Sequence, residues 1–208
     1  MDLTEGEIHA TLARLRRRLA EQPPQRLEAP PPLLRAAVLI PVLRSGEQVH
    51  LLFTRRTNTV LTHKGQISFP GGQREGSDAS MVETALRETY EEIGLAASAV
   101  SVLGEMDDVF TSVSGYVVTP VVGIVAEAEP ALTLAPAEVK SVFTVSIDRL
   151  LDDSVHTTDT RELEGRPFRI HFFTVGGDTI WGATGFILHQ FLQAWQAASP
   201  EAVSRSRS

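Results

Sequence analysis

The segment from Phe69 to Leu95 constrains the fold more than any other part of this 208-residue chain. It opens with the dipeptide Gly71-Gly72, which favours a tight turn. Ser80 and Glu83 then have the spacing of a capping box, and Gly94 is typical of the position just after a helix ends. Residues able to face a core recur at helical spacing: Val82, Leu86, Thr89 and Ile93. The pattern predicts a Gly-rich turn followed by an amphipathic helix over 80–93.

Three glutamates of this predicted helix would share one face. Glu88, Glu91 and Glu92 stand at i, i+3 and i+4, where like charges repel by a few tenths of a kcal/mol per pair. Such crowding is easier to tolerate beside a divalent cation, and Mg²⁺ takes one or two carboxylates together with water and phosphate oxygens. Arg87 has the spacing to pair with Glu83 or Glu91 and to hold a carboxylate in one rotamer. The alternative interpretation is a solvated helix face.

Taken together, the loop and the helix resemble the Nudix box, the signature of Mg²⁺-dependent hydrolases that cut a diphosphate linked to another moiety. The residues that match are Gly71-Gly72, Arg87-Glu88, Glu91-Glu92 and Gly94-Leu95. One position departs from the general box, because Asp78 stands where that box has an upstream Glu, with one additional residue before Arg87. The resemblance therefore does not make Asp78 a metal ligand, and a role as helix N-cap is an alternative.

A second resemblance, to the coenzyme A pyrophosphatase branch of the Nudix hydrolases, extends from about Arg35 to Ala198. It rests on LFTRRT at 52–57 and THKGQISFPGG at 62–72, and that branch also has the Asp and the longer spacing. Further similar segments are SGY at 114–116, PVVG at 120–123, EV at 138–139 and WGAT at 181–184. Thr57 replaces the usual Ser or Ala, and Leu61 replaces the usual Arg.

The resemblance implies an α/β/α sandwich whose box helix presents its acids to a groove. It also implies that Glu88 and Glu92 bind Mg²⁺ or Mn²⁺, helped by the carbonyl of Gly71 or Gly72. Glu91 would bind a further ion or orient water. The general base is left open between Glu91 and Glu138.

The same resemblance implies the substrate and its contacts. Coenzyme A would be hydrolysed to adenosine 3′,5′-bisphosphate and 4′-phosphopantetheine, with Arg55, Arg56, His63 and Lys64 contacting the phosphates. The alternatives are a Nudix pyrophosphatase acting on ADP-ribose, NADH or another nucleoside diphosphate derivative, and a non-catalytic Nudix module that binds a nucleotide or a protein.

Patterning along the chain predicts an α+β fold with a mixed sheet. Residues 1–33 read as an amphipathic helix and a Pro-rich linker, 34–198 as the Nudix domain, and 199–208 as a flexible tail. Strands are expected near 36–43, 49–54, 100–103, 115–125, 139–145 and 168–175, and a last helix over 184–198. The polar stretch from Asp152 to Gly165 is expected to be a loop.

Composition excludes several other functions. The chain has no Cys and a formal net charge of −7, which argues against redox chemistry and against nucleic acid as the main partner. It shows neither the order of residues of a signal peptide nor a stretch able to cross a membrane, so a cytoplasmic location is expected. The oligomeric state is open, with a homodimer as one option. No metal-binding spacing links the histidines, which are expected to be structural or exposed: His9, His50, His63, His156, His171 and His189.

Overall fold

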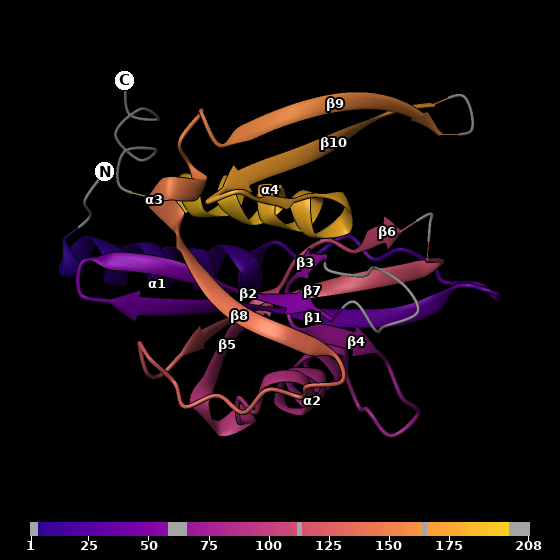
Figure 1. Ribbon diagram of the computed structural model, residues 1–208, viewed down its shortest axis with the longest axis horizontal. Coiled ribbons are helices and arrows are strands. Elements are labelled where there is room, and N and C mark those ends of the chain that lie inside the picture. Colours follow the sequence, from indigo (N-terminus) through magenta and orange to yellow (C-terminus); the bar gives the residue numbers. More distant parts are fainter. Residues whose placement is uncertain (1–3, 58–65, 112–113, 164–165, 200–208) are drawn as a thin grey trace.

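A mixed β-sheet forms the centre of the protein (Figure 1). The computed structural model describes residues 4–57, 66–111, 114–163 and 166–199. The main sheet has eight strands in the order β3-β2-β1-β7-β5, with β4 beside β1, β6 beside β7 and β8 beside β2. Its strands are β1 (Leu34–Ser45), β2 (Gln48–Arg56), β3 (Ile67–Ser68), β4 (Gly71–Gln73), β5 (Val100–Glu105), β6 (Val109–Thr111), β7 (Tyr116–Val125) and β8 (Val139–Ser146).

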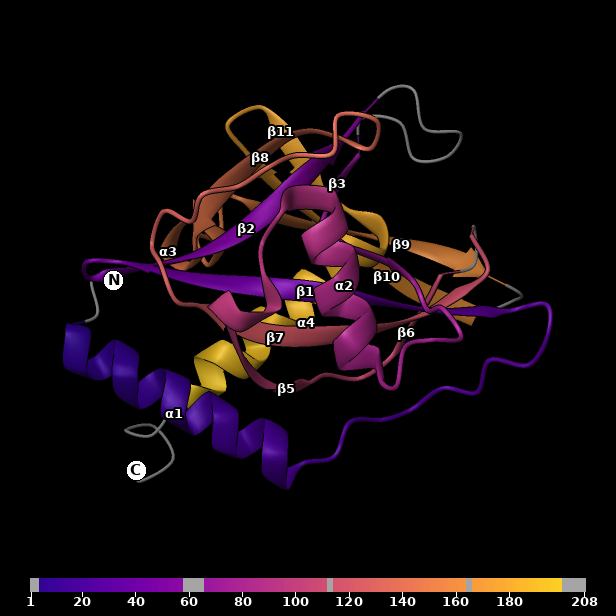
Figure 2. The same cartoon turned by 90° about the horizontal axis from the view of Figure 1, so that it is seen from below.

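Helices cover both faces of this sheet, which confirms the expected α/β/α sandwich (Figures 1 and 2). One face carries α2 (Met81–Ile93), and the other carries α1 (Glu5–Glu21) and α4 (Gly182–Ala198). Side chains of β1 alternate between the two sides, so that Leu39 packs in the core under α2 and Ile40 in the core under α4. Short helical segments are η1 (Ala97–Ala99) and α3 (Ile147–Leu150). In the described part of the chain, no helix is both long and apolar enough to span a membrane.

A second, three-stranded sheet lies over α4 (Figure 1). It consists of β9 (His156–Leu163), β10 (Arg166–Val175) and β11 (Asp178–Ile180), in the order β11-β10-β9. The prediction of a loop over 152–165 is therefore wrong. The described side chains of β9 are partly buried or exposed, so the strand lacks the alternation of apolar residues that marks a half-buried strand.

The N-terminal segment packs onto the rest of the domain. Ile8, Leu12 and Leu15 of α1 are buried in the same core as α4, and α1 also contacts β5. The Pro-rich stretch that follows is held by Arg26, which forms an ion pair with the buried Asp108 at 2.9 Å. The division of the chain at residue 33 stays a prediction.

Candidate functional site

Local capping fixes α2, which carries the predicted site residues. Ser80 is the N-cap and its hydroxyl accepts a hydrogen bond from the Glu83 backbone N–H at 3.1 Å. Gly94 ends the helix in the left-handed conformation, at φ 72°. Thr84, Ala85, Thr89 and Ile93 are buried. Glu92 is buried on the same side of the helix, so the face of α2 that packs onto β4 also carries an acid.

The two predicted metal ligands lie against the Gly-Gly segment. Glu92 Oε2 accepts a hydrogen bond from the Gly71 N–H at 3.1 Å. A Cβ built on Gly72 would lie 2.4 Å from Glu88 Oε2, so only glycine leaves room for that carboxylate. The segment is β4, a short strand paired with β1, rather than the expected turn. The close approach explains the glycines: Gly71 has φ 151°, and a Cβ there would meet the Ala37 carbonyl oxygen at 2.3 Å.

Burial and mutual repulsion make both carboxylates costly to ionise. Desolvation is the main cause that raises the pKa of Glu92 to about 7, with the charges of Glu138 and Glu88 adding to it and Arg56 opposing it. Desolvation also raises the pKa of Glu88, against the opposing charge of Arg87. A positive charge placed among these acids would relieve the repulsion.

The loop that precedes β8 brings Glu138 to the same place. Its backbone is tied to the end of α2, because the Thr133 N–H donates to the Ile93 carbonyl and the Ala135 N–H to the Glu92 carbonyl, both at 2.9 Å. The Thr57 N–H donates to the Glu138 carbonyl at 2.9 Å, which ties the loop to the end of β2. The Glu138 carboxylate is exposed and forms no ion pair with another described residue. Its charge still acts on Glu88 and Glu92.

Arg87 connects α2 to the loop before it. Its Nε and Nη2 donate to the two carboxylate oxygens of Asp78 at 2.9 and 3.0 Å, and its Nη1 donates to Glu88 at 3.0 Å. Asp78 also accepts from the Thr84 hydroxyl. The alternative of Asp78 as helix N-cap is wrong, because Ser80 takes that position. Asp78 instead orients the arginine, and these hydrogen bonds hold its pKa well below the usual range.

Glu91 is more exposed to solvent than Glu88 and Glu92, the other two glutamates of the predicted site on α2. Its side chain is 55% exposed and pairs with Arg87 at 3.2 Å, whereas the Glu92 side chain is 4% exposed. The charges of Glu91 and Glu138 both act on Glu88, and that of Glu138 also acts on Glu92, so two exposed acids flank the two more buried ones.

Replacing Asp78 by Asn should lower the free energy of unfolding by about 2 kcal/mol at pH 7, because hydrogen bonds to a charged acceptor are lost. The folded-state pKa of Asp78 is depressed, so its contribution is fully present above the unfolded-state pKa of about 3.9 and is lost as pH falls through the folded-state pKa. Urea unfolding from pH 7 to pH 3 measures this. The gap between wild type and variant should narrow below about pH 4. The exposed Asp159→Asn is the control, and a gap that persists unchanged at pH 3 would contradict the assignment.

The residues predicted to contact the substrate phosphates differ from one another in their surroundings. Arg56 Nη1 lies 3.6 Å from Glu92 Oε1, and its Nε is buried without a hydrogen-bond partner among the described residues. Arg55 is held by an ion pair with Asp178 and lies over the Phe143 ring, with its guanidinium carbon 5.7 Å from the ring centre. His63 and Lys64 lie outside the described residues.

The donors in this cluster fit a hard divalent cation. Glu88 and Glu92 supply carboxylate oxygens beside a glycine backbone, and such ions prefer oxygen ligands. Two half-buried or buried carboxylates with raised pKa values are the arrangement that a bound cation would stabilise. The residues present therefore fit Mg²⁺ or Mn²⁺, with Gly72 as a further predicted ligand through its carbonyl.

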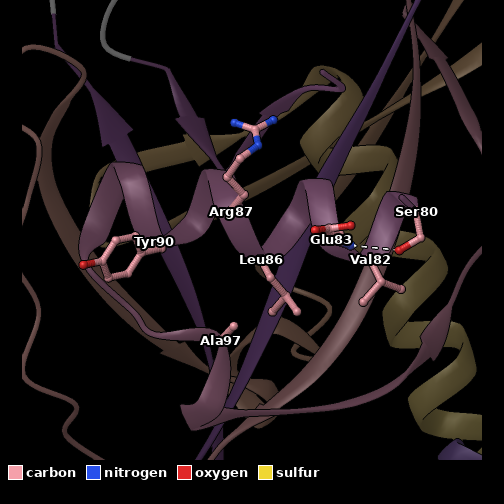
Figure 3. A pocket seen from close by; sticks show the side chains of 7 residues that line it. All are labelled: Ser80, Val82, Glu83, Leu86, Arg87, Tyr90 and Ala97. Carbon is pink, nitrogen blue, oxygen red and sulfur yellow. Dashed lines mark hydrogen bonds between the residues drawn. The ribbon is translucent and has the colours of Figure 1, made fainter. Parts of the chain in front are cut away.

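A shallow pocket of about 400 Å³ lies on another side of α2 (Figure 3). Its lining includes Val82, Leu86, Tyr90 and Ala97. The Arg87 guanidinium extends to the opposite side of the helix from Leu86. Arg87 also lines this pocket, but Glu88 and Glu92 do not, so the pocket lies beside the two acids and does not contain them.

Sequence reasoning missed two groups of residues. The first is Asp78 as the partner of Arg87, nine residues away across a loop. The second is a histidine cluster, because no spacing in the sequence links its three members. His156, His171 and His189 have ligand atoms that all lie within 4.8 Å of one another.

Comparison with known proteins identifies the family. The model of the NUDIX domain matches residues 33–164. An uncharacterized Nudix hydrolase NudL of Photorhabdus laumondii is 38% identical over 180 residues, which are 82% of this chain and 93% of that protein. The protein of the same description from Yersinia pestis is 39% identical over 160 residues, 76% of this chain and 78% of the relative.

Solved structures support the same fold. A MutT/nudix family protein from Enterococcus faecalis superposes with a TM-score of 0.54 and 19% identity, over 81% of this chain and 64% of that chain. The family match covers more than half of the chain, and it contains the buried glutamates of α2 and the glycines of β4. The chain therefore belongs to the Nudix family and is a Nudix pyrophosphatase.

Proposed function

We propose that this enzyme hydrolyses the diphosphate of coenzyme A or its derivatives, giving adenosine 3′,5′-bisphosphate and 4′-phosphopantetheine. The observation that carries the hydrolytic part is the packing of the Glu88 and Glu92 carboxylates against Gly71 and Gly72. The coenzyme A part is supported by the upstream motif at 52–57 and 62–72.

The geometry supports a different role for each of the site residues. Glu88 and Glu92 would hold Mg²⁺ or Mn²⁺, and Arg87 keeps the Glu88 carboxylate in one orientation through the 3.0 Å hydrogen bond. Such an ion would offset the charge of the diphosphate and favour attack by water on phosphorus. Arg56, whose guanidinium lies beside Glu92, would contact a phosphate oxygen of the substrate.

We infer that Glu138, rather than Glu91, is the general base. Glu138 has a carboxylate without an ion pair to any described residue, whereas Glu91 is held by Arg87 at 3.2 Å. A base must be able to reach the water whose proton it takes. Its place on a loop fastened to the end of α2 keeps Glu138 beside the cluster.

Glu138→Gln should lower kcat by about 10²- to 10⁴-fold, the usual contribution of a general base, while Glu91→Gln should cost at least tenfold less. The two variants are matched, since each removes the charge of one exposed glutamate. Steady-state kinetics with saturating Mg²⁺ measures the effect. A larger loss in Glu91→Gln would assign the base to Glu91.

The substrate assignment is tested with a panel of diphosphates. Purified enzyme with Mg²⁺ is given coenzyme A, acetyl-coenzyme A, ADP-ribose, NADH and diadenosine polyphosphates, and the products are separated by chromatography. The expected result is the highest kcat/KM on a coenzyme A compound, with release of 4′-phosphopantetheine or its acylated form. Turnover of ADP-ribose or NADH without turnover of coenzyme A would overturn the assignment in favour of a generic nucleoside diphosphate pyrophosphatase.

A cytoplasmic location stays a proposal, and a homodimer stays one option for the oligomeric state. Size-exclusion chromatography with light scattering would test the dimer. A monomeric mass at micromolar concentration would exclude that option.

A further inference from the structure

Three histidines converge where the β9–β10 hairpin lies over α4, on the far side of the main sheet from α2 (Figure 1). His156 comes from β9, His171 from β10 and His189 from α4. His171 is 4% exposed and the other two are partly buried. All three lie away from the carboxylates of the hydrolytic site, and neither the proposed reaction nor its substrate contacts use them.

The strand register explains how the cluster forms. His156 pairs with Phe173 across β9 and β10, and its ring stacks on the Phe173 ring at 4.4 Å between centroids. His171 stands two residues before Phe173, so both side chains point to the face of the hairpin that packs on α4. His189 meets His171 from the helix, with ring centroids 3.8 Å apart.

We propose that His156, His171 and His189 form a binding site for a transition-metal ion of the Zn²⁺ type, separate from the hydrolytic centre. Three neutral imidazoles are a ligand set that suits Zn²⁺, Ni²⁺ or Cu²⁺, whereas Mg²⁺ and Mn²⁺ prefer oxygen. Water would complete a tetrahedral arrangement at the fourth position.

One pair of ligand atoms is already near the separation that such an ion needs, and all three lie within 4.8 Å of one another. His156 Nε2 and His171 Nδ1 are 2.9 Å apart and share a hydrogen bond. With Zn–N bonds of 2.0–2.1 Å, tetrahedral ligand atoms lie roughly 3.3 Å from one another. The ion would take the place of this hydrogen bond after a small opening of the pair and a turn of the His189 ring. No described residue forms a hydrogen bond with a ring nitrogen of His189, so that ligand is available.

The surroundings keep the imidazoles in the neutral form that binds metal. Desolvation is the main cause that lowers the pKa of His171 to about 4, and the charges of His189, His156 and Arg169 add to it. Among the charged groups that act on the cluster, Arg169 opposes a cation and Asp153 favours one. Both are exposed, so solvent screens them.

A metal ion at this position would fasten the hairpin to α4. The three ligands lie on three separate elements, so binding would add to the free energy of unfolding in proportion to the logarithm of metal concentration over Kd. The ion would thus stabilise the packing of β9 and β10 on the domain without touching the diphosphate.

The test uses the full chain without a histidine tag and measures Zn²⁺ binding by competition with a chromophoric chelator. All proteins carry Glu92→Gln and are kept in excess Mg²⁺, so that the acidic site does not contribute. The background protein is compared with the same protein carrying His189→Gln, and with an exposed control, His9→Gln. We expect one Zn²⁺ per chain in the background protein and in the His9 control, and at least about 100-fold weaker binding after His189→Gln, because losing a residue that only orients a ligand already costs 10–100-fold.

His156→Gln is the second variant, which keeps the test decisive if His189→Gln does not fold, as judged by circular dichroism. Substitution of Co²⁺ adds a spectroscopic readout, since tetrahedral cobalt has strong visible bands and the variants should lose them. Zn²⁺ should also raise the Tm of the background protein and of the His9→Gln control. It should leave the Tm of His189→Gln and His156→Gln unchanged. The proposal would be overturned if His189→Gln and His156→Gln bound Zn²⁺ as tightly as the background protein. It would also be overturned if the background protein bound no Zn²⁺.

Discussion

Glu92→Gln is expected to lower kcat by about 10³-fold, equivalent to about 4 kcal/mol of transition-state stabilisation. The Glu92 carboxylate is nearly inaccessible to solvent, and the charges of Glu88 and Glu138 act on it. Solvent water therefore cannot compensate for the negative charge that the substitution removes. The amide keeps the size of the side chain and can still accept the hydrogen bond from the Gly71 N–H. Only the charge is lost.

The same substitution should leave the metal-free protein as stable as the wild type. Removing a buried negative charge relieves repulsion with Glu88 and Glu138, and this offsets the loss of the Arg56 ion pair at 3.6 Å. Steady-state kinetics and thermal melting in EDTA check the two parts. Glu83→Gln, on the exposed side of the same helix, is the matched control and should retain wild-type activity. Full activity in Glu92→Gln would contradict the role of Glu92 as a ligand.

Gly72→Ala is expected to lower kcat/KM by at least 100-fold while changing Tm by only a few degrees. The new methyl group would lie 2.4 Å from Glu88 Oε2, and the flexible end of the glutamate would have to move away. Moving it is cheap for the fold but displaces a ligand of the site, and a misplacement of about 1 Å can cost about 10²-fold in rate.

Gly76→Ala provides the control for this prediction. Gly76 belongs to the same Gly-rich segment, and a Cβ there would meet nothing within 4 Å. Kinetics and melting of both variants should therefore separate an effect on the site from an effect on the loop. If Gly72→Ala were as active as Gly76→Ala, the position of Glu88 against the β4 backbone would not matter for the reaction.

The parts of the fold that could be predicted are those with local signals. Capping and apolar spacing place α2 within one residue of its observed bounds, Met81–Ile93. The order and spacing of the glycines and glutamates were enough to predict the family. Apolar runs also predict the long strands of the main sheet, because those strands are buried on both faces.

The parts that could not be predicted depend on contacts between distant residues. Strand β9 is polar because the hairpin lies at the surface, so its pairing with β10 leaves no pattern in its own sequence. Asp78 lies two residues before the N-cap of α2, and its pairing with Arg87 in the second turn depends on how the chain enters the helix. The histidine cluster joins three elements with no fixed spacing, although one signal was available. His171 and Phe173 stand two residues apart on β10, so both side chains lie on the inward-facing side of the strand. A titratable residue buried there needs a partner.

The same distinction between local sequence signals and contacts between distant residues applies to the candidate site. Glu88 and Glu92 follow from helical spacing, but their different burial from Glu91 depends on where β4 and the loop before β8 pack against α2. Glu138 lies 46 residues beyond Glu92, and only the hydrogen bonds that tie its loop to the end of α2 bring it back.

The central claim is that the buried glutamates of α2 hold a divalent ion for cleavage of a diphosphate. Titration of Mn²⁺ followed by electron paramagnetic resonance of the free ion tests it most directly, since Mn²⁺ prefers oxygen ligands over imidazole. Wild type should bind Mn²⁺, and Glu92→Gln should bind it at least about 100-fold more weakly. Equal Mn²⁺ affinity in the two proteins would contradict the account.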